Sequence, residues 1–251
     1  MKKIIVIPAR ISSTRLPKKV MLSINKKTLL QRVFEQCIKV KNVSVFIATD
    51  SYEVRKSCLN FTDNIIMTSS DHKSGTERIV EATKKLDYNF LINVQADQLF
   101  VSPKLLEKLF ALLIKRDFDI ATVCERISSF AEILNPNIVK LVKNINNEAL
   151  YFSRSPIPYI NDNTLQSNEK LFFDKKNIYK HVGIYGYKKE FLEKYNDLVK
   201  MGLENIENLE QLRILENGFK INLLETTFKS FSIDTKEDYK NALKIIKSAN
   251  Y

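Results

Sequence analysis

The sequence predicts an α/β protein with a mostly parallel sheet and one β-hairpin insertion. In the first half of the chain, short apolar runs alternate with amphipathic segments of helical spacing, a pattern typical of parallel strands joined by right-handed crossovers. Residues 139–154 (VKLVKNINNEALYFSR) instead place two strand-like runs around an Asn-rich turn, which indicates a hairpin. With 251 residues, 44% of them hydrophobic, we expect a single domain over residues 1–251, in which residues 139–187 form the insertion.

The first predicted strand, Ile4–Ile7, leads into a loop rich in cations. Pro8 ends this strand because proline cannot donate to a sheet ladder. The loop that follows carries four cations and three hydroxyls, which are Arg10, Ser12, Ser13, Thr14, Arg15, Lys18 and Lys19. Ligands bind at the carboxyl ends of strands in open α/β sheets, and arginine and lysine suit phosphate oxygens. The loop therefore indicates a polyphosphate site, and a solvated basic loop is the alternative.

The remaining elements of the first half follow in order. A helix is expected to begin at Thr28, which forms a capping box with Gln31. The later elements are a strand at 43–49, a helix at 52–59, a strand at 64–67, a helix that opens at 74–76, a strand at 90–95, a helix from Pro103 to about residue 116, and a strand at 119–124.

Two of the turns in this half could bind a ligand. Gly75 would let the backbone approach a ligand closely at the start of a helix, where free N–H groups favour anions, although an ordinary helix entry fits equally well. Asp97 directly follows a buried strand, where it could hold magnesium, which prefers one or two carboxylates with substrate phosphates and water. A loop-capping aspartate is the alternative at this position.

The second half is predicted to close the domain after the hairpin. We expect a polar surface loop at 161–177, a strand at 179–187, one helix over 203–218 with an apolar face of Leu203, Ile206, Leu209 and Leu212, and strands at 219–224 and 228–233. Asp234 ends the last strand and so repeats the position of Asp97. Thr235 and Asp238 form a capping box for a final helix.

Composition restricts the classes of partner. The net charge of +11 comes from lysines dispersed along the chain, and no nucleic-acid-binding motif is present, so nucleic acid is not an expected partner. No signal peptide is apparent, and no apolar run reaches the roughly 18 residues that a spanning helix needs. Three scattered cysteines suit reduced thiols. We therefore expect a cytoplasmic protein without a membrane partner.

Seven motifs, in order along the chain, resemble those of the 3-deoxy-manno-octulosonate cytidylyltransferase (CMP-Kdo synthetase) family. They are IPARISSTRLPKK, HKSGTERIVEA, NVQADQ, ALYFSRSPIP, HVGIYGY, NLEQLRILENG and SIDTKEDY. The resemblance implies a Rossmann-like nucleotide-diphospho-sugar transferase fold and a homodimer. It also implies a magnesium-dependent reaction of CTP with the acidic sugar Kdo, giving CMP-Kdo and pyrophosphate for the inner core of lipopolysaccharide.

The resemblance also implies roles for individual residues. Arg10, Ser13, Arg15 and Lys19 match the triphosphate loop, and Ser74, Gly75, Thr76, Arg78 and Gln95 match the segments that hold the cytidine. Asp97 and Asp234 match the metal-binding carboxylates, and with Lys19 and Arg15 they are the expected catalytic residues. Arg154, His181, Tyr185, Glu210 and Gln211 match the region that holds the acidic sugar.

Four positions depart from the family pattern and leave alternatives open. Lys18 stands where the family usually has glycine, and Ala96, Gln98 and Leu99 replace its glycine, glutamate and proline around Asp97. The same chemistry on an amino-substituted octulosonate or a nonulosonate is therefore one alternative. A sugar-nucleotide-dependent glycosyltransferase and a basic nucleic-acid-binding protein are more remote ones.

Overall fold

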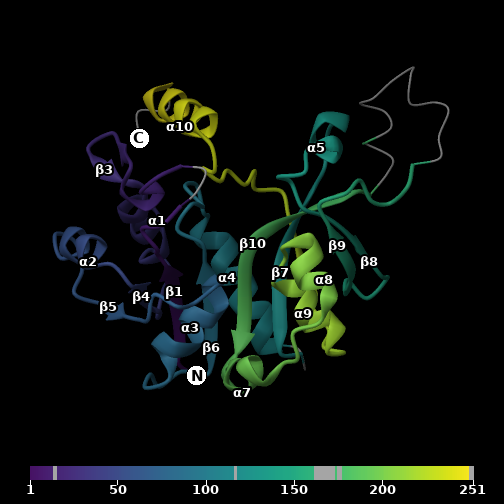
Figure 1. Cartoon of the computed structure of the whole chain (residues 1–251), viewed down its shortest axis with the longest axis horizontal. Helices are drawn as coiled ribbons and strands as arrows, with labels where there is room; N and C mark the ends of the chain where they lie inside the picture. The colour runs from purple at the N-terminus through teal and green to yellow at the C-terminus, as the bar shows by residue number, and fades with distance from the viewer. Residues whose placement is uncertain (14–15, 116–117, 161–172, 174–176, 249–251) are drawn as a thin grey trace. The chain divides into compact units, whose positions relative to one another are not determined.

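The computed structural model describes residues 1–13, 16–115, 118–160, 173 and 177–248, which form two compact units (Figure 1). Unit 1 comprises Met1–Ala111 and Ser230–Tyr251, and unit 2 comprises Leu112–Lys229. The loop expected at 161–177 lies outside the described residues except for Phe173 and Asn177. Within the described part of the chain, no helix combines the length and apolar character needed to cross a membrane.

Unit 1 is built on four parallel strands in the order β6-β1-β4-β5. These strands are β1 (Lys3–Pro8), β4 (Ser44–Thr49), β5 (Ile65–Met67) and β6 (Phe90–Val94). The chain passes from β1 outward through β4 to β5, and then returns to place β6 on the other side of β1. The carboxyl ends of β1 and β6 therefore flank the point where the strand order reverses, which is where open α/β sheets bind ligands.

The helices of unit 1 begin where their capping residues predict. They are α1 (Leu29–Cys37), α2 (Tyr52–Cys58), α3 (Gly75–Thr83) and α10 (Lys236–Ser248), and α4 (Pro103–Lys115) carries the chain into unit 2. Thr28 Oγ1 accepts a hydrogen bond from the Gln31 N–H at 3.1 Å, as predicted for α1. The Thr235–Asp238 capping box is also confirmed, since each side chain accepts from the other residue's backbone N–H.

Short elements connect β1 to α1. A 3-10 helix (Lys19–Met21) follows the cation-rich loop, and a two-residue hairpin of β2 (Ser23–Ile24) and β3 (Lys27–Thr28) precedes α1. The sequence did not predict these elements, because two or three residues are too few to show a repeating hydrophobic pattern. They determine where Lys19 lies.

The strand expected at 228–233 is wrong. Residues 231–233 instead run antiparallel to the turn after β6, with one isolated bridge between Gln98 and Ser232. Leu99 N–H donates to the Phe231 carbonyl at 3.2 Å, and Ile233 N–H donates to the Asp97 carbonyl at 3.2 Å. The segment is too short for a strand because its partner, residues 97–99, is itself a turn. These hydrogen bonds bring the segments before Asp234 and after Asp97 side by side.

Unit 2 contains a mixed set of strands. They are β7 (Ile120–Arg126), β8 (Lys140–Lys143), β9 (Ala149–Ser153), β10 (Tyr179–Lys188) and β11 (Asn222–Thr226). β11 is parallel to β7, whereas β10 is antiparallel to both β7 and β8. β8 and β9 form the predicted hairpin. Short helices α5 (Phe130–Leu134) and α7 (Lys189–Lys194) were not predicted.

The single helix expected over 203–218 is also wrong, because two helices occupy this segment. α8 (Gly202–Glu207) ends at Asn208, whose φ of 52° lies in the left-handed region, and α9 (Gln211–Glu216) follows. Ile206, expected on the apolar face, is 80% exposed, whereas Leu209 and Leu212 are buried. Asparagine tolerates the left-handed conformation better than most residues, so the break occurs there although the apolar spacing continues.

His181 is enclosed in unit 2 by apolar rings. Its imidazole lies 5.2 Å from the Phe152 ring and 5.1 Å from the Tyr185 ring, measured between centroids. Thr122 Oγ1 donates its only proton to the Ile184 carbonyl, so His181 Nε2 must donate to Thr122 Oγ1, which lies 2.9 Å away. Burial without a carboxylate partner lowers the pKa of His181 to about 3.

These observations confirm the predicted fold class, a mostly parallel α/β sheet with flanking helices and a hairpin. The further role of residues 139–187 in dimerisation stays a prediction.

The pKa of His181 predicts how stability depends on pH. Below the ordinary histidine pKa of 6.5, the unfolded chain takes up a proton that folded His181 does not, so stability is lost as pH falls from 6.5 towards 3. We expect the unfolding free energy of the wild type to fall by about 2 kcal/mol more than that of His181→Gln between pH 7 and pH 5. Urea denaturation of both proteins at the two pH values measures this difference, and equal losses would contradict it.

Candidate functional site

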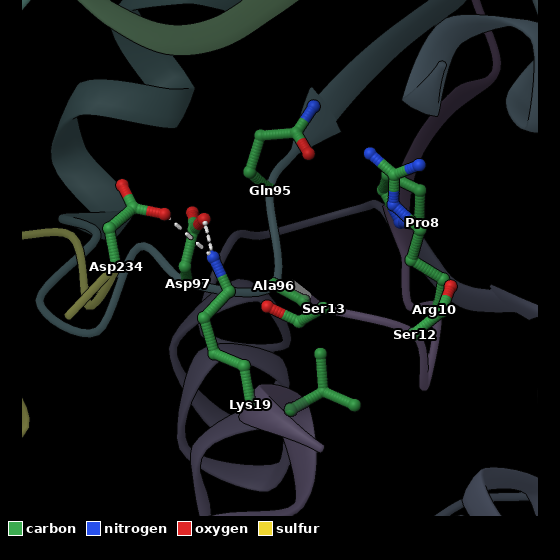
Figure 2. A pocket seen from close by; sticks show the side chains of 10 residues that line it. Pro8, Arg10, Ser12, Ser13, Lys19, Gln95, Ala96, Asp97 and Asp234 are labelled. Atoms are coloured by element: carbon green, nitrogen blue, oxygen red, sulfur yellow. Dashed lines mark hydrogen bonds and ion pairs between the residues drawn. The ribbon is translucent and has the colours of Figure 1, made fainter. Parts of the chain in front are cut away.

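The candidate site is a cavity of about 320 Å³ in unit 1, at the carboxyl ends of β1 and β6 (Figure 2). Its walls come from the loop after β1, the 3-10 helix, the turn after β6 and the segment before α10. The lining residues are Pro8, Arg10, Ser12, Ser13, Lys19, Val20, Gln95, Ala96, Asp97 and Asp234. The cavity thus lies at the reversal of strand order, where the fold predicts a ligand.

Lys19, Asp97 and Asp234 form an ionic cluster at one side of this cavity. The Lys19 ammonium lies 2.7 Å from Asp97 Oδ2 and 3.0 Å from Asp234 Oδ1 (Figure 2). The side chains are 15%, 19% and 31% exposed, respectively, so the cluster is only partly screened by water. Burial lowers the pKa of Lys19, but the two carboxylates outweigh it by charge and hydrogen bonding, and the pKa stands above its ordinary value. Lys19 is therefore a cation that two acidic groups hold in place.

Backbone pairing explains why two aspartates far apart in sequence meet. Asp97 lies in the turn after β6, and its carbonyl accepts from the N–H of Ile233, the residue before Asp234. Asp234 N–H in turn donates to Asp238 at the start of α10, which fixes the end of the segment. The two carboxylates thus lie beside each other because their backbones do.

Lys19 is the first residue of the 3-10 helix, and the start of this helix determines its position at the cluster. Lys18, just before it, has a φ of 52°, and Val20, just after it, is buried. The Lys18 ammonium contacts both carboxylate oxygens of Glu53 at 2.8 Å and does not line the cavity. The extra cation at this position therefore pairs with α2 rather than adding to the site.

The loop after β1 contributes Arg10, Ser12 and Ser13 to the cavity wall. Arg10 is exposed, and its guanidinium donates to the Lys73 carbonyl at 3.4 Å. Thr14 and Arg15 lie outside the described residues, so the expected role of Arg15 has no structural account. The described part of the loop presents a cation and hydroxyls to the cavity, as a polyphosphate site requires.

Of the residues expected to hold cytidine, some lie at the cavity and others lie in or before the first turn of α3. Gln95 lines the cavity, and Gly75 lies beside it, since a Cβ on Gly75 would meet Gln95 Nε2 at 3.1 Å and Pro8 at 3.4 Å. Ser74 caps α3, with Oγ accepting from the Glu77 N–H at 3.1 Å. Thr76 is buried in the first turn of α3.

Arg78 takes part in a buried ion pair. It is 2% exposed, and its guanidinium donates to Asp50 at 2.9 Å and to Thr68. This pair joins α3 to the ends of β4 and β5. The contact accounts for a structural role, and the expected nucleotide contact of Arg78 stays a prediction.

The residues expected to bind the sugar belong to unit 2. Arg154 lies at the end of β9, where its guanidinium donates to the carbonyls of Glu207 at 2.9 Å, Pro136 at 3.0 Å and Asn208 at 3.3 Å. Two of these carbonyls belong to the end of α8. Arg154 is therefore held rigidly by backbone groups.

The other expected sugar residues lie along β10 and α9. Tyr185 is buried, and burial, followed by the charge of Glu210, raises its pKa. Gln211 is 3% exposed, and its Nε2 has no hydrogen-bond partner among the described residues. His181 is neutral in its apolar enclosure, as described above. Contact of these residues with a sugar stays a prediction.

The side chains of the cavity could bind magnesium only together with ligands from substrate phosphates and water. Within the described ranges, no group of three or more His, Cys, Asp or Glu side chains could hold a metal ion. The cavity does offer the two adjacent carboxylates of Asp97 and Asp234. Mg²⁺ typically takes one or two carboxylates and completes its shell with substrate phosphates and water, so these residues fit it.

Sequence reasoning missed several residues that shape the site. Glu53 forms an ion pair with Lys18, and Asp50 forms one with Arg78. Glu207 accepts hydrogen bonds from Ser153 Oγ at 2.6 Å and from the Arg154 N–H at 2.9 Å. Only Asp50 had a signal, its position after a strand, which it shares with Asp97. The other two are ordinary glutamates on helices, and only the tertiary structure reveals their partners.

The chain is similar to known proteins over most of its length. Residues 4–221 match the family described as cytidylyltransferase. A 3-deoxy-manno-octulosonate cytidylyltransferase of Francisella philomiragia is 40% identical over 246 residues, which cover 96% of this chain and 97% of the relative. One of the same description from Thermodesulfovibrio yellowstonii is 41% identical, with 98% of both chains covered.

Solved structures show the same likeness. A CMP:2-keto-3-deoxy-manno-octonic acid synthetase complexed with CTP superimposes with a TM-score of 0.89 at 36% identity, covering 99% of this chain and all of the other. A putative glucose-1-phosphate thymidylyltransferase of Bacillus anthracis, at 10% identity, 97% of its chain covered and 99% of this one, has a TM-score of 0.69 and so shares the fold alone. With a match over most of its length and relatives at about 40% identity, this chain belongs to the cytidylyltransferase family.

Proposed function

We propose that the chain transfers the cytidylyl group of CTP to 3-deoxy-manno-octulosonate (Kdo), giving CMP-Kdo and pyrophosphate. The observation that carries this proposal is the convergence of Lys19, Asp97 and Asp234 in one cavity with Arg10. The names of relatives that align over nearly the whole chain support the choice of CTP and Kdo.

The first physical problem is charge. CTP is strongly anionic and Kdo carries a carboxylate, so the two substrates repel unless cations are placed between them. Arg10 and Lys19 supply positive charge at the cavity, and Ser12 and Ser13 supply hydroxyl donors for phosphate oxygens. Arg15, by its place in the same loop, is proposed to add a further cation. We assign the triphosphate to this wall.

The base is assigned to the wall formed by Gln95 and Gly75. Gly75 has no side chain, so the helix start of α3 can lie against the Gln95 amide and Pro8. Gln95 has both an amide donor and a carbonyl acceptor, and the edge of cytosine needs both. Ser74, Thr76 and Arg78 support this wall as parts of α3 and its connection to β4.

The reaction itself is a displacement at the α-phosphorus. The anomeric hydroxyl of Kdo forms the new O–P bond, the bond between the α-phosphorus and the bridging oxygen breaks, and pyrophosphate leaves while the hydroxyl loses its proton to the surrounding solvent. The role of the protein is to position the two reactants and to stabilise the charge of the leaving pyrophosphate, for which Lys19 and Arg10 are placed. Asp97 and Asp234 would hold Mg²⁺, which when bound supplies a Lewis acid that lowers the pKa of the attacking hydroxyl.

We propose that Arg154 and residues of β10 and α9 bind the sugar. A guanidinium matches a carboxylate bidentately, and Arg154 is already held by three backbone carbonyls, so binding the Kdo carboxylate would cost it little side-chain entropy. Tyr185, Glu210 and Gln211 would complete the site with polar groups, and neutral His181 would line it.

We also propose that the protein is cytoplasmic and works as a homodimer. Exposed apolar side chains on and after the β8–β9 hairpin support a dimer interface within residues 139–187. Ile145 is 97% exposed, Leu150 60% and Tyr159 88%.

The carboxylate assignment is tested with Asp97→Asn. The amide keeps the shape but removes one charge from the cation site, so turnover is expected to fall at least about 100-fold, the size of loss typical when one electrostatic stabiliser is removed. Pyrophosphate release from CTP and Kdo measures it, and circular dichroism checks that the fold is kept. Asp63→Asn, at an exposed aspartate outside the cavity, is the matched control. Turnover of Asp97→Asn equal to that of the control would refute the metal role.

The substrate assignment is tested by a panel of sugars and nucleotides. With CTP and Mg²⁺, we expect pyrophosphate release to be fastest with Kdo, compared with an amino-substituted octulosonate and a nonulosonate. ATP, GTP and UTP with Kdo are the nucleotide controls and are expected to react far more slowly. Faster release with another acidic sugar would transfer the assignment to that sugar, as Ala96, Gln98 and Leu99 permit.

A further inference from the structure

The Lys19 ammonium lies where a cation shared by Asp97 and Asp234 would lie. Its two contacts, 2.7 Å to Asp97 and 3.0 Å to Asp234, are short and nearly equal, so the ammonium bridges the carboxylates rather than pairing with one of them (Figure 2). The same two carboxylates are the groups that fit Mg²⁺. One pair of acidic groups thus has two candidate cations.

The two cations exclude each other. A divalent ion that bridged both carboxylates would approach an ammonium at hydrogen-bond distance from the same oxygens, and like charges at such separation repel strongly in a partly buried site. Lys19 is 15% exposed and is surrounded by the cavity wall, so water screens this repulsion poorly. Metal binding therefore requires the ammonium to move.

Lysine is suited to such a movement. Its charge sits on a flexible four-carbon stem, and the cavity beside it has a volume of about 320 Å³. Arg10 and Ser12 lie on the opposite side of the cavity, and Ser13 lies between them and Lys19 (Figure 2). These three residues form the wall assigned to the triphosphate. A phosphate oxygen bound there would give Lys19 a new anionic partner and would at the same time provide the metal with ligands.

We propose that Lys19 occupies the divalent-cation position of the free protein and yields it when a nucleoside triphosphate binds, so that nucleotide and metal binding are positively coupled. This inference rests on the proposed function for the identity of the nucleotide but not for the competition itself. The coupling is reciprocal, because each ligand stabilises the arrangement in which Lys19 has left the carboxylates. In the free protein, Lys19 also reduces the repulsion between the two adjacent carboxylates, because its ammonium lies within hydrogen-bond distance of both.

The test is Mn²⁺ binding to the free protein, followed by electron paramagnetic resonance without nucleotide or sugar. Lys19→Met removes the ammonium, and we expect it to bind Mn²⁺ at least tenfold more tightly than the wild type. Lys18→Met is the matched control, since it removes the same charge one residue away at a side chain that pairs with Glu53. It is expected to bind Mn²⁺ as the wild type does. Adding Asp97→Asn to Lys19→Met should abolish the gain.

A second variant and a second measurement guard against misfolding. Lys19→Gln keeps an amide that can donate to either carboxylate, and it should also bind Mn²⁺ more tightly. With the wild type and CTP together, Mn²⁺ should bind more tightly than it binds to CTP in the absence of protein. Affinity of folded Lys19→Met and Lys19→Gln no higher than that of Lys18→Met would overturn the proposal. Because no turnover is measured, a gain in Mn²⁺ affinity would stand even if the wild type released no pyrophosphate from CTP and Kdo.

Discussion

The site depends on the antiparallel pairing of two short segments, residues 97–99 after β6 and residues 231–233 before α10. Two backbone hydrogen bonds and one bridge join them, and the Phe100 and Phe231 rings pack 5.7 Å apart beside this pairing. This pairing brings Asp97 and Asp234 together, although more than half of the chain separates them in sequence. The energetic cost of placing two carboxylates side by side is offset by Lys19, whose raised pKa reports the same interaction.

The parallel strands explain why the loop that carries Arg10, Ser12 and Ser13 lines the same cavity as these carboxylates. Strand order reverses between β1 and β6, so the loop after β1 and the turn after β6 open onto the same crevice. Chemistry at an α-phosphate needs cations and carboxylates within one small space, and the reversal provides it without any long connection. Substitutions at Ala96, Gln98 and Leu99 fall inside this arrangement, yet Gln98 and Leu99 still pair with the returning segment. Two of the residues that depart from the family motif therefore take part in the pairing that brings Asp97 and Asp234 together.

The sequence predicted best the features that depend on local chemistry. The buried runs of β1, β4 and β6 and the caps at Thr28 and Thr235 follow from short-range rules, and each was found where expected. Prediction failed where a single residue or a distant partner decides the outcome. Asn208 interrupts an otherwise continuous helical pattern, and residues 228–233 look like a strand but meet only a turn. For the site, the pattern of a strand followed by an aspartate holds at Asp97 but not at Asp234, because residues 228–233 form only an isolated bridge. The contact of both aspartates with Lys19 could not be read from the sequence, because it depends on a 3-10 helix of three residues.

We propose that Asp97 and Asp234 share one divalent cation next to the triphosphate. A crystal structure of the protein with CTP and Mn²⁺, with data collected at the manganese absorption edge, would locate this cation. We expect an anomalous peak next to the carboxylates of Asp97 and Asp234 and the triphosphate, with the Lys19 ammonium moved to the triphosphate. A peak bound by phosphate oxygens alone, with Lys19 still bridging Asp97 and Asp234, would contradict it.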